Sequence, residues 1–205
     1  MSARHRLLWL PLLVVLAGAA AIFARSRLRG GGSPPETPSL AVLGDLPDFS
    51  LVERSGRSVA RADLLGRVWI ADFIFTRCGG PCPLLTMEMA RLAKALPSEV
   101  RFVSVSVDPA HDTPEILASY AETYGADRER WFFLTGEKSA VYSLVGDGFH
   151  VTAKEEAGAD PASAVTHSLR FALVDRRGRI RGYYQGYERE ELRRLREDVA
   201  RVLAE

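Results

Sequence analysis

Along the chain, short apolar runs typical of strands alternate with segments in which apolar residues recur every three or four positions, as in helices. Residues 67–75 (RVWIADFIF) form a nearly continuous apolar run, which is typical of a strand buried on both faces of a parallel sheet. Residues 100–107 (VRFVSVSV) and 131–134 (WFFL) predict two further strands. Apolar residues three or four apart predict helices between and after these strands. Their apolar faces are Leu85, Met89, Leu92 and Leu96; Ile116, Leu117 and Tyr120; and Leu192, Leu195, Val199 and Val202.

Two hairpins flank this alternating core. Residues 46–60 (LPDFSLVERSGRSVA) predict the first hairpin, with its turn at Ser55 and Gly56. Residues 169–186 predict the second, with the turn at RRGR, and residues 137–145 predict a short helix. Strands alternating with helices, followed by a hairpin and a helix, indicate a three-layer α/β domain with an N-terminal hairpin. The order is that of a thioredoxin-like fold.

Residues 7–23 (LLWLPLLVVLAGAAAIF) are 17 residues without a charge. As a helix they would be about 25 Å long, the short end of what spans a bilayer. A cleaved signal peptide is the alternative, since AGAAA offers small residues for cleavage. The apolar run exceeds the usual signal-peptide core, so we expect one transmembrane helix and a domain on the extracytoplasmic side of the cytoplasmic membrane.

The composition changes after this segment. Residues 1–29 form the expected anchor, residues 30–39 a Gly/Pro linker, and residues 40–205 the globular domain. The first 40 residues hold five arginines and one glutamate, which leaves 22 basic and 25 acidic residues in the rest. A mildly acidic domain argues against nucleic acid as a partner.

The chemistry of the chain centres on TRCGGPC (76–82), because Cys78 and Cys82 are its only cysteines. They follow a predicted strand and begin a predicted helix, an edge where α/β sheets bind ligands. The helix N-terminus is expected to favour thiolates, and a spacing of four lets both sulfurs face one way. Three interpretations remain open: a structural disulfide, a redox pair that forms a disulfide, and a two-thiolate metal site.

The metal interpretation gains weight because a third ligand can be proposed. His167 immediately precedes the strand predicted at 169–175, where the entering loop of a thioredoxin-like fold faces the active-site cysteines. His111 and His150 are expected to be solvated loop or edge residues. Two thiolates and one imidazole suit copper, Cu(I) especially, whereas structural zinc would want a fourth protein ligand.

Several residues expected near the cysteine pair also have predicted roles. Asp72, inside the apolar strand, could accept a thiol proton or pair with a basic side chain. Asp108 ends a strand at the same sheet edge and is expected near the site. Asp112 and Thr113 are expected to cap a helix that Pro114 opens. Arg77 is expected to help keep thiolate charge.

The chain resembles the Sco/SenC family of copper-handling, thioredoxin-like membrane proteins. The matching stretches are FIFTRCGGPCP, RFVSVSVDPAHDTPEIL, WFFLTG and HSLRFALVDRRGRIRGYYQG, in that order, and they span nearly all of residues 45–190. Cys-x-x-x-Cys-Pro, VDP-x-x-DTP and a late His-Ser before a strand form a highly specific combination. Asp72 departs from the family pattern, in which a neutral residue is expected.

The resemblance implies a copper chaperone, anchored in the membrane, that helps assemble the CuA centre of cytochrome c oxidase. It implies Cys78, Cys82 and His167 as ligands of copper, as Cu(I) or Cu(II). It also implies three kinds of partner: subunit II of the oxidase, an upstream copper donor and a thiol reductant. The same cysteines could instead serve a thiol-disulfide oxidoreductase without a metal role, a possibility that Asp72 supports.

Overall fold

The computed structural model describes residues 23, 25, 39–151, 154–155, 165–166 and 169–205. Phe23 and Arg25 are helical and exposed. Within the described residues, no helix combines the length and apolar character needed to cross a membrane. All of the predicted membrane segment except Phe23, and residues 30–38 of the predicted linker, lie outside the description.

Residues 39–205 form one compact unit built on an eight-stranded mixed sheet. Its strands run in the order β1, β10, β9, β4, β5, β6, β2, β3 across the sheet. Their bounds are Gly44–Asp45 (β1), Ser50–Glu53 (β2), Ser58–Ala60 (β3), Trp69–Ile74 (β4), Arg101–Ser106 (β5), Trp131–Thr135 (β6), Arg170–Val174 (β9) and Arg179–Gln185 (β10). The three central strands β4, β5 and β6 are parallel, and their immediate neighbours β9 and β2 are antiparallel to them.

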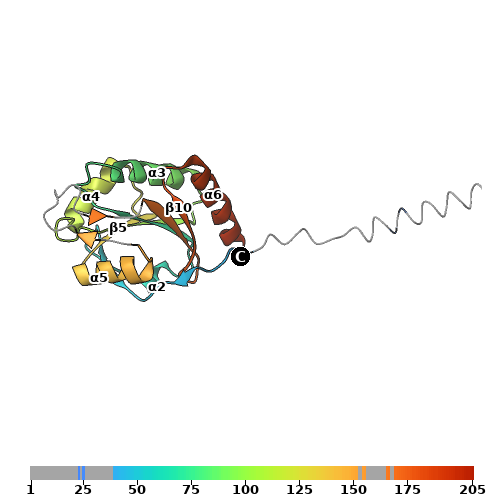
Figure 1. Ribbon diagram of the computed structural model, residues 1–205, viewed down its shortest axis with the longest axis horizontal. Helices are drawn as coiled ribbons and strands as arrows, with labels where there is room; N and C mark the ends of the chain where they lie inside the picture. Colours follow the sequence, from blue (N-terminus) through green and yellow to red (C-terminus); the bar gives the residue numbers. More distant parts are fainter. Residues whose placement is uncertain (1–22, 24, 26–38, 152–153, 156–164, 167–168) are drawn as a thin grey trace, which may run out of the picture. The chain divides into compact units, whose positions relative to one another are not determined.

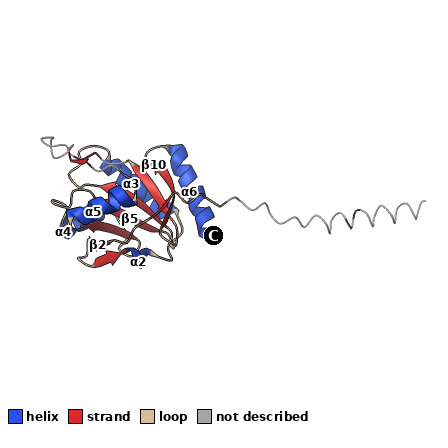
Figure 2. Cartoon of the chain, turned by 60° about the horizontal axis from the view of Figure 1, so that its bottom comes forward, coloured by secondary structure: helices blue, strands red, loops and turns tan. Residues whose placement is uncertain are grey.

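Helices cover both faces of the sheet, which confirms the predicted three layers (Figure 1). One face carries α3 (Cys82–Ala95), α4 (Pro114–Thr123) and α6 (Arg189–Ala204); the other carries α2 (Arg61–Leu64), α5 (Lys138–Ser143) and a π-helical turn, η1 (Leu144–Gly148). Figure 2 shows these helices against the sheet in a second orientation. A separate short hairpin pairs β7 (Lys154–Glu155) with β8 (Val165–Thr166).

Strand β4 shows why the sequence folds this way. Its six residues are all buried, because successive side chains enter opposite cores. Trp69 and Phe73 pack under α2, α5 and η1, whereas Ile70 and Ile74 pack under α3 and α6. Each fully buried large side chain contributes roughly 1.5–3 kcal/mol, so the two cores dominate the stability of the domain.

Both predicted hairpins are confirmed. β2 pairs with β3, and β9 pairs with β10. Gly56 and Gly178 lie in their turns with φ of 82° and 74°, a left-handed conformation that glycine adopts without strain. The short elements β1, α2, η1, β7 and β8 were not predicted.

A buried arginine joins the two ends of this unit. Arg181 on β10 donates hydrogen bonds to the carbonyl of Leu40 at 2.6 Å and to the carboxylate of Glu205 at 2.7 Å. It also donates to Asp175 at 3.1 Å and to the hydroxyl of Ser39 at 3.2 Å. The guanidinium therefore binds the first and last residues of the unit together.

Candidate functional site

The cysteine pair lies where β4 leads into α3. The backbone amide of Cys78 donates to the carbonyl of Phe75 at 3.2 Å, which closes a tight turn directly after the strand. Cys82 is the first residue of α3, and both cysteines are thiols in the structure. The predicted placement at the carboxyl end of β4 and the start of a helix is confirmed.

The two sulfurs differ in their environments. Cys78 is 8% exposed and Cys82 is fully buried. Of the two cysteines, only Cys78 is therefore in contact with solvent. Burial raises the pKa of Cys82 well above the usual thiol value, and the neighbouring Cys78 raises it further. The helix N-terminus was expected to favour thiolate at both positions; for Cys82, desolvation outweighs that effect.

Asp72 is buried on the face of β4 that packs under α3. Neither of its carboxylate oxygens has a hydrogen-bond partner among the described residues. Burial raises the pKa of Asp72 to about 7, and the nearby Ser104 hydroxyl offsets this only in part. The Asp72 carboxyl also contributes to raising the pKa of Cys82, which places its charge within electrostatic reach of the pair. No described basic side chain pairs with Asp72, contrary to one of the two expectations.

Arg77, next to Cys78, is held by Asp108. Its Nη2 and Nε atoms donate to the same carboxylate oxygen of Asp108 at 2.7 and 3.3 Å. Asp108 lies in the loop after β5, so its predicted position near the site is confirmed. Because the guanidinium is paired with a carboxylate, its positive charge acts on the neighbouring thiol only in part-neutralised form.

The expected cap at the start of α4 is formed by Thr113 alone. The Thr113 side chain accepts a hydrogen bond from the amide of Ile116. Asp112 was expected to share this role, and that expectation is wrong: its buried carboxylate accepts from Thr76 and Ser106 instead. Asp112, one residue before this N-cap, is fully buried.

Asp108, His111 and Asp112 bring their ligand-type atoms within 4.8 Å of one another. His111 was expected to be solvated, but its Nδ1 lies 3.0 Å from Asp112 while the ring remains partly exposed. The oxygens of Asp112 are occupied by hydrogen bonds and Asp108 is paired with Arg77. The group is therefore a hydrogen-bonded cluster that supports the cysteine turn.

His167, the predicted third ligand, lies outside the described residues, as do the predictions that depend on its position. Strand β9 begins at Arg170 and runs antiparallel to β4, so it starts at the edge of the sheet that carries the cysteines. The carbonyl of Leu169 and the side chain of Leu85, in the first turn of α3, both border Gly186. The chain that enters β9 thus lies beside the start of α3.

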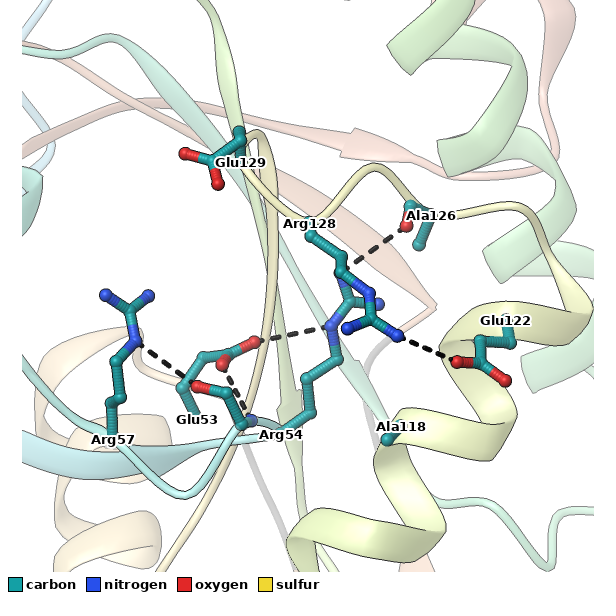
Figure 3. Close-up of a pocket in the computed structure, with 9 residues that line it drawn as sticks. Glu53, Arg54, Arg57, Ala118, Glu122, Ala126, Arg128 and Glu129 are labelled. Carbon is teal, nitrogen blue, oxygen red and sulfur yellow. Dashed lines mark hydrogen bonds and ion pairs between the residues drawn. The ribbon is translucent and has the colours of Figure 1, made fainter.

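A pocket of about 260 Å³ lies at the opposite edge of the sheet, between the β2–β3 turn, α4 and the loop before β6 (Figure 3). Four of its charged groups form two ion pairs: Arg54 pairs with Glu53 at 3.4 Å, and Arg128 pairs with Glu122 at 3.0 Å. The cysteines follow the carboxyl end of β4, whereas this pocket lies at the amino end of β6, so it belongs to a different part of the surface.

Comparison with known proteins places this site in a family context. The sequence profile described as SCO1/SenC matches residues 44–204. The chain is 36% identical over 148 residues to the SCO1 protein homolog of Bacillus subtilis, covering 70% of this chain and 75% of that protein. It is 35% identical over 145 residues to a Stutzerimonas stutzeri protein named for an inferred copper-binding role, covering 67% and 68%.

The fold is shared with solved structures. BsSco belongs to the Sco family of cytochrome c oxidase assembly proteins, and a disulfide switch has been identified in it. It superposes with a TM-score of 0.70 at 32% identity, covering 80% of this chain and 98% of that one. The predicted thioredoxin-like α/β fold of the domain is confirmed by this likeness and by the layered mixed sheet.

Proposed function

Because this chain belongs to the SCO1/SenC family, we propose that it binds copper through the thiolates of Cys78 and Cys82 and the imidazole of His167. We propose further that it delivers the metal to the CuA centre of cytochrome c oxidase, in subunit II, or reduces the cysteines of that centre. An upstream copper donor and a thiol reductant complete the set of proposed partners. Residues 7–23 would anchor the protein in the cytoplasmic membrane with its domain on the extracytoplasmic side.

One observation carries the copper proposal: two thiols adjoin at the carboxyl edge of β4, and only Cys78 reaches the surface. Soft thiolates with one imidazole form a three-ligand set that suits Cu(I). The start of β9 beside α3 supports His167 as the third member, since only Ser168 separates it from Leu169. A three-ligand ion leaves room for an incoming ligand of an acceptor protein, as transfer requires.

A titration of the reduced full-length chain with Cu(I), against a competing chelator, tests the ligand set. We expect Cys78→Ser and Cys82→Ser to abolish tight binding, and His167→Asn to weaken it by at least about tenfold. His150→Asn is the matched control, because His150 is exposed and its left-handed φ of 53° suits asparagine. Equal affinities for His167→Asn and His150→Asn would remove His167 from the set.

A second candidate function is thiol-disulfide exchange without a metal, and the buried Asp72 favours it. In this scheme the thiolate of Cys78, the more accessible of the two sulfurs, attacks a substrate disulfide and releases one substrate thiolate, which takes a proton from water. Cys82 gives its proton to the Asp72 carboxylate and attacks Cys78, which releases the second substrate thiolate and leaves a Cys78–Cys82 disulfide; the protonated Asp72 can return this proton to the departing thiolate. Two electrons pass to the substrate, and the external thiol reductant later restores the dithiol.

The two candidates separate by the same variants. Copper handling predicts that His167→Asn impairs metal binding and oxidase assembly while the rate of disulfide reduction is kept. Disulfide exchange alone predicts that Asp72→Asn slows reduction of a model disulfide and that His167→Asn changes nothing. If wild-type protein neither binds Cu(I) nor reduces the disulfide, both proposals fail.

A further inference from the structure

The turn that carries Cys78 is clamped from one side by a buried carboxylate. Asp112 is fully buried in the loop after β5. It accepts hydrogen bonds from the backbone amide of Thr76 at 3.1 Å and from the Thr76 hydroxyl at 2.5 Å. It also accepts from the Ser106 hydroxyl at 2.5 Å, and His111 Nδ1 lies 3.0 Å away. One side chain thus joins the end of β4, the end of β5 and the loop before α4.

The clamp acts on one side of the cysteine turn only. Thr76, two residues before Cys78, is held by both its backbone and its side chain, and Arg77 is held by Asp108. Residues 79–81 on the other side are exposed, and no atom of the described residues beyond the chain neighbours lies within 4 Å of a Cβ added at Gly79 or Gly80. Cys82 is fixed separately by α3. Besides the bond of its own amide to Phe75 and its packing in the core, the position of Cys78 relative to Cys82 therefore depends on the segment that Asp112 holds.

We propose that Asp112 is a positioning residue for Cys78, which sets how readily the two sulfurs close a disulfide or share a metal ion. This inference deepens the proposed function and rests on it. Disulfide closure demands specific sulfur and Cα separations, so a small shift of the turn changes the equilibrium between dithiol and disulfide. The carboxylate reaches neither sulfur through a hydrogen bond that the structure records; it acts through Thr76.

The test uses the full-length chain and four variants. Asp112→Asn removes the acceptor charge, and Thr76→Val removes only the hydroxyl bond while keeping the side-chain shape. Thr76→Ser keeps the hydroxyl and serves as the rescue. Asp175→Asn is the matched control, because Asp175 is another buried carboxylate, at the opposite edge of the sheet, that holds Arg179 and Arg181.

Two properties are measured for each variant. The first is the equilibrium constant for oxidation by glutathione disulfide, in which the Cys78–Cys82 dithiol becomes a disulfide and two glutathione thiols form. The second is the rate at which iodoacetamide modifies Cys78 in a Cys82→Ser background, which depends on neither copper nor disulfide formation. We expect Asp112→Asn and Thr76→Val to change both by at least about fivefold, and Thr76→Ser and Asp175→Asn to change them by less than about twofold.

The outcomes separate a failure of the positioning role of Asp112 from a failure of the proposed copper or disulfide function. If Asp112→Asn and Thr76→Val lower the melting temperature but leave both quantities at wild-type values, the clamp is only structural and the inference is wrong. If Asp112→Asn does not fold, the comparison of Thr76→Val with Thr76→Ser decides. If wild-type protein forms no disulfide and binds no Cu(I), the proposed function fails, while the alkylation rates still decide whether Asp112 positions Cys78.

Discussion

Gly186 lies so close to Leu85 that a Cβ atom on the glycine would overlap the Leu85 Cδ1 atom. Gly186 follows β10, and Leu85 is a buried residue in the first turn of α3, three residues after Cys82. The same Cβ position is 3.2 Å from the ring of Phe171. The loop after β10 therefore packs against the helix that begins with Cys82, and any side chain at position 186 would force Leu85 to move.

Gly186→Ala is expected to lower the free energy of unfolding by about 1–3 kcal/mol, because the added methyl group overpacks a buried contact. Urea unfolding followed by circular dichroism measures the loss. Adding Leu85→Ala should make the double variant more stable than the sum of the two single effects predicts, since it removes the clashing atom. Strict additivity would show that the two side chains do not share this contact.

Asp72→Asn is expected to change how stability depends on pH. The pKa of Asp72 is raised from 3.8, the ordinary value of an aspartate, to about 7 in the fold, so the folded state binds one more proton than the unfolded chain between these pH values. The free energy of unfolding should therefore fall as the pH rises from about 4 to 7, by on the order of 4 kcal/mol from this group.

The asparagine variant cannot ionise, so this part of the fall should disappear. The slope of unfolding free energy between pH 4 and 7 is the quantity to compare, because the buried amide also changes the absolute stability. A slope equal to that of the wild type would contradict a raised pKa at Asp72. Between pH 7.5 and 9 the two proteins should show similar slopes.

The two thiols should react at different rates. Cys78 is 8% exposed and Cys82 is fully buried with a raised pKa, so iodoacetamide should modify Cys78 at least about ten times faster. Mass spectrometry of peptides from the reduced protein at pH 8 measures both rates. In concentrated urea, where burial is lost, the ratio should approach one. Comparable rates in the folded protein would refute the asymmetry.

Alanine should be tolerated at Gly79 and at Gly80. Neither glycine has a positive φ, and in the described part of the chain no atom beyond its chain neighbours lies within 4 Å of the Cβ that each would gain. We expect each variant to unfold with unchanged free energy or with a gain of up to about 1 kcal/mol, because alanine restricts the unfolded chain. Chelator competition should show an unchanged Cu(I) affinity. A loss of affinity in either variant would indicate that the turn must rearrange to hold copper.

The sequence predicted the elements whose burial is complete. The run WIADFIF predicts β4 because both faces of that strand enter a core. The start of α3 soon after β4 was predictable from Pro83, which suits a first helical turn, and from the apolar helical face that begins at Leu85. The strand of two residues at Gly44–Asp45 carries no comparable period, since it exists through pairing with β10. Local pattern cannot reveal an element that depends on a distant partner.

The site was predictable in part for the same reason. Cys78 and Cys82 are conspicuous because they are the only cysteines, and their order along the chain fixes their place in the sheet. The role of Asp112 was missed, because an aspartate before Thr-Pro-Glu looks like a helix cap. Its bond to Thr76, 36 residues earlier, depends on the parallel pairing of β4 with β5. The parallel pairing expected for two consecutive buried strands could have indicated this contact, because it brings the residues that follow both strands to the same edge of the sheet.

The hydrogen bonds by which Arg181 joins Ser39 and Leu40 to Glu205 have a mechanical consequence. Tension on the chain that precedes Ser39 would load the bonds of this guanidinium to Leu40 and Glu205, and through Glu205 the end of α6. Those contacts lie near the turn at Asp175, at the edge of the sheet remote from Cys78. A force applied at Ser39 would therefore enter the domain at the edge of the sheet remote from Cys78, and the bonds of Arg181 would carry it before it reached the sulfur pair.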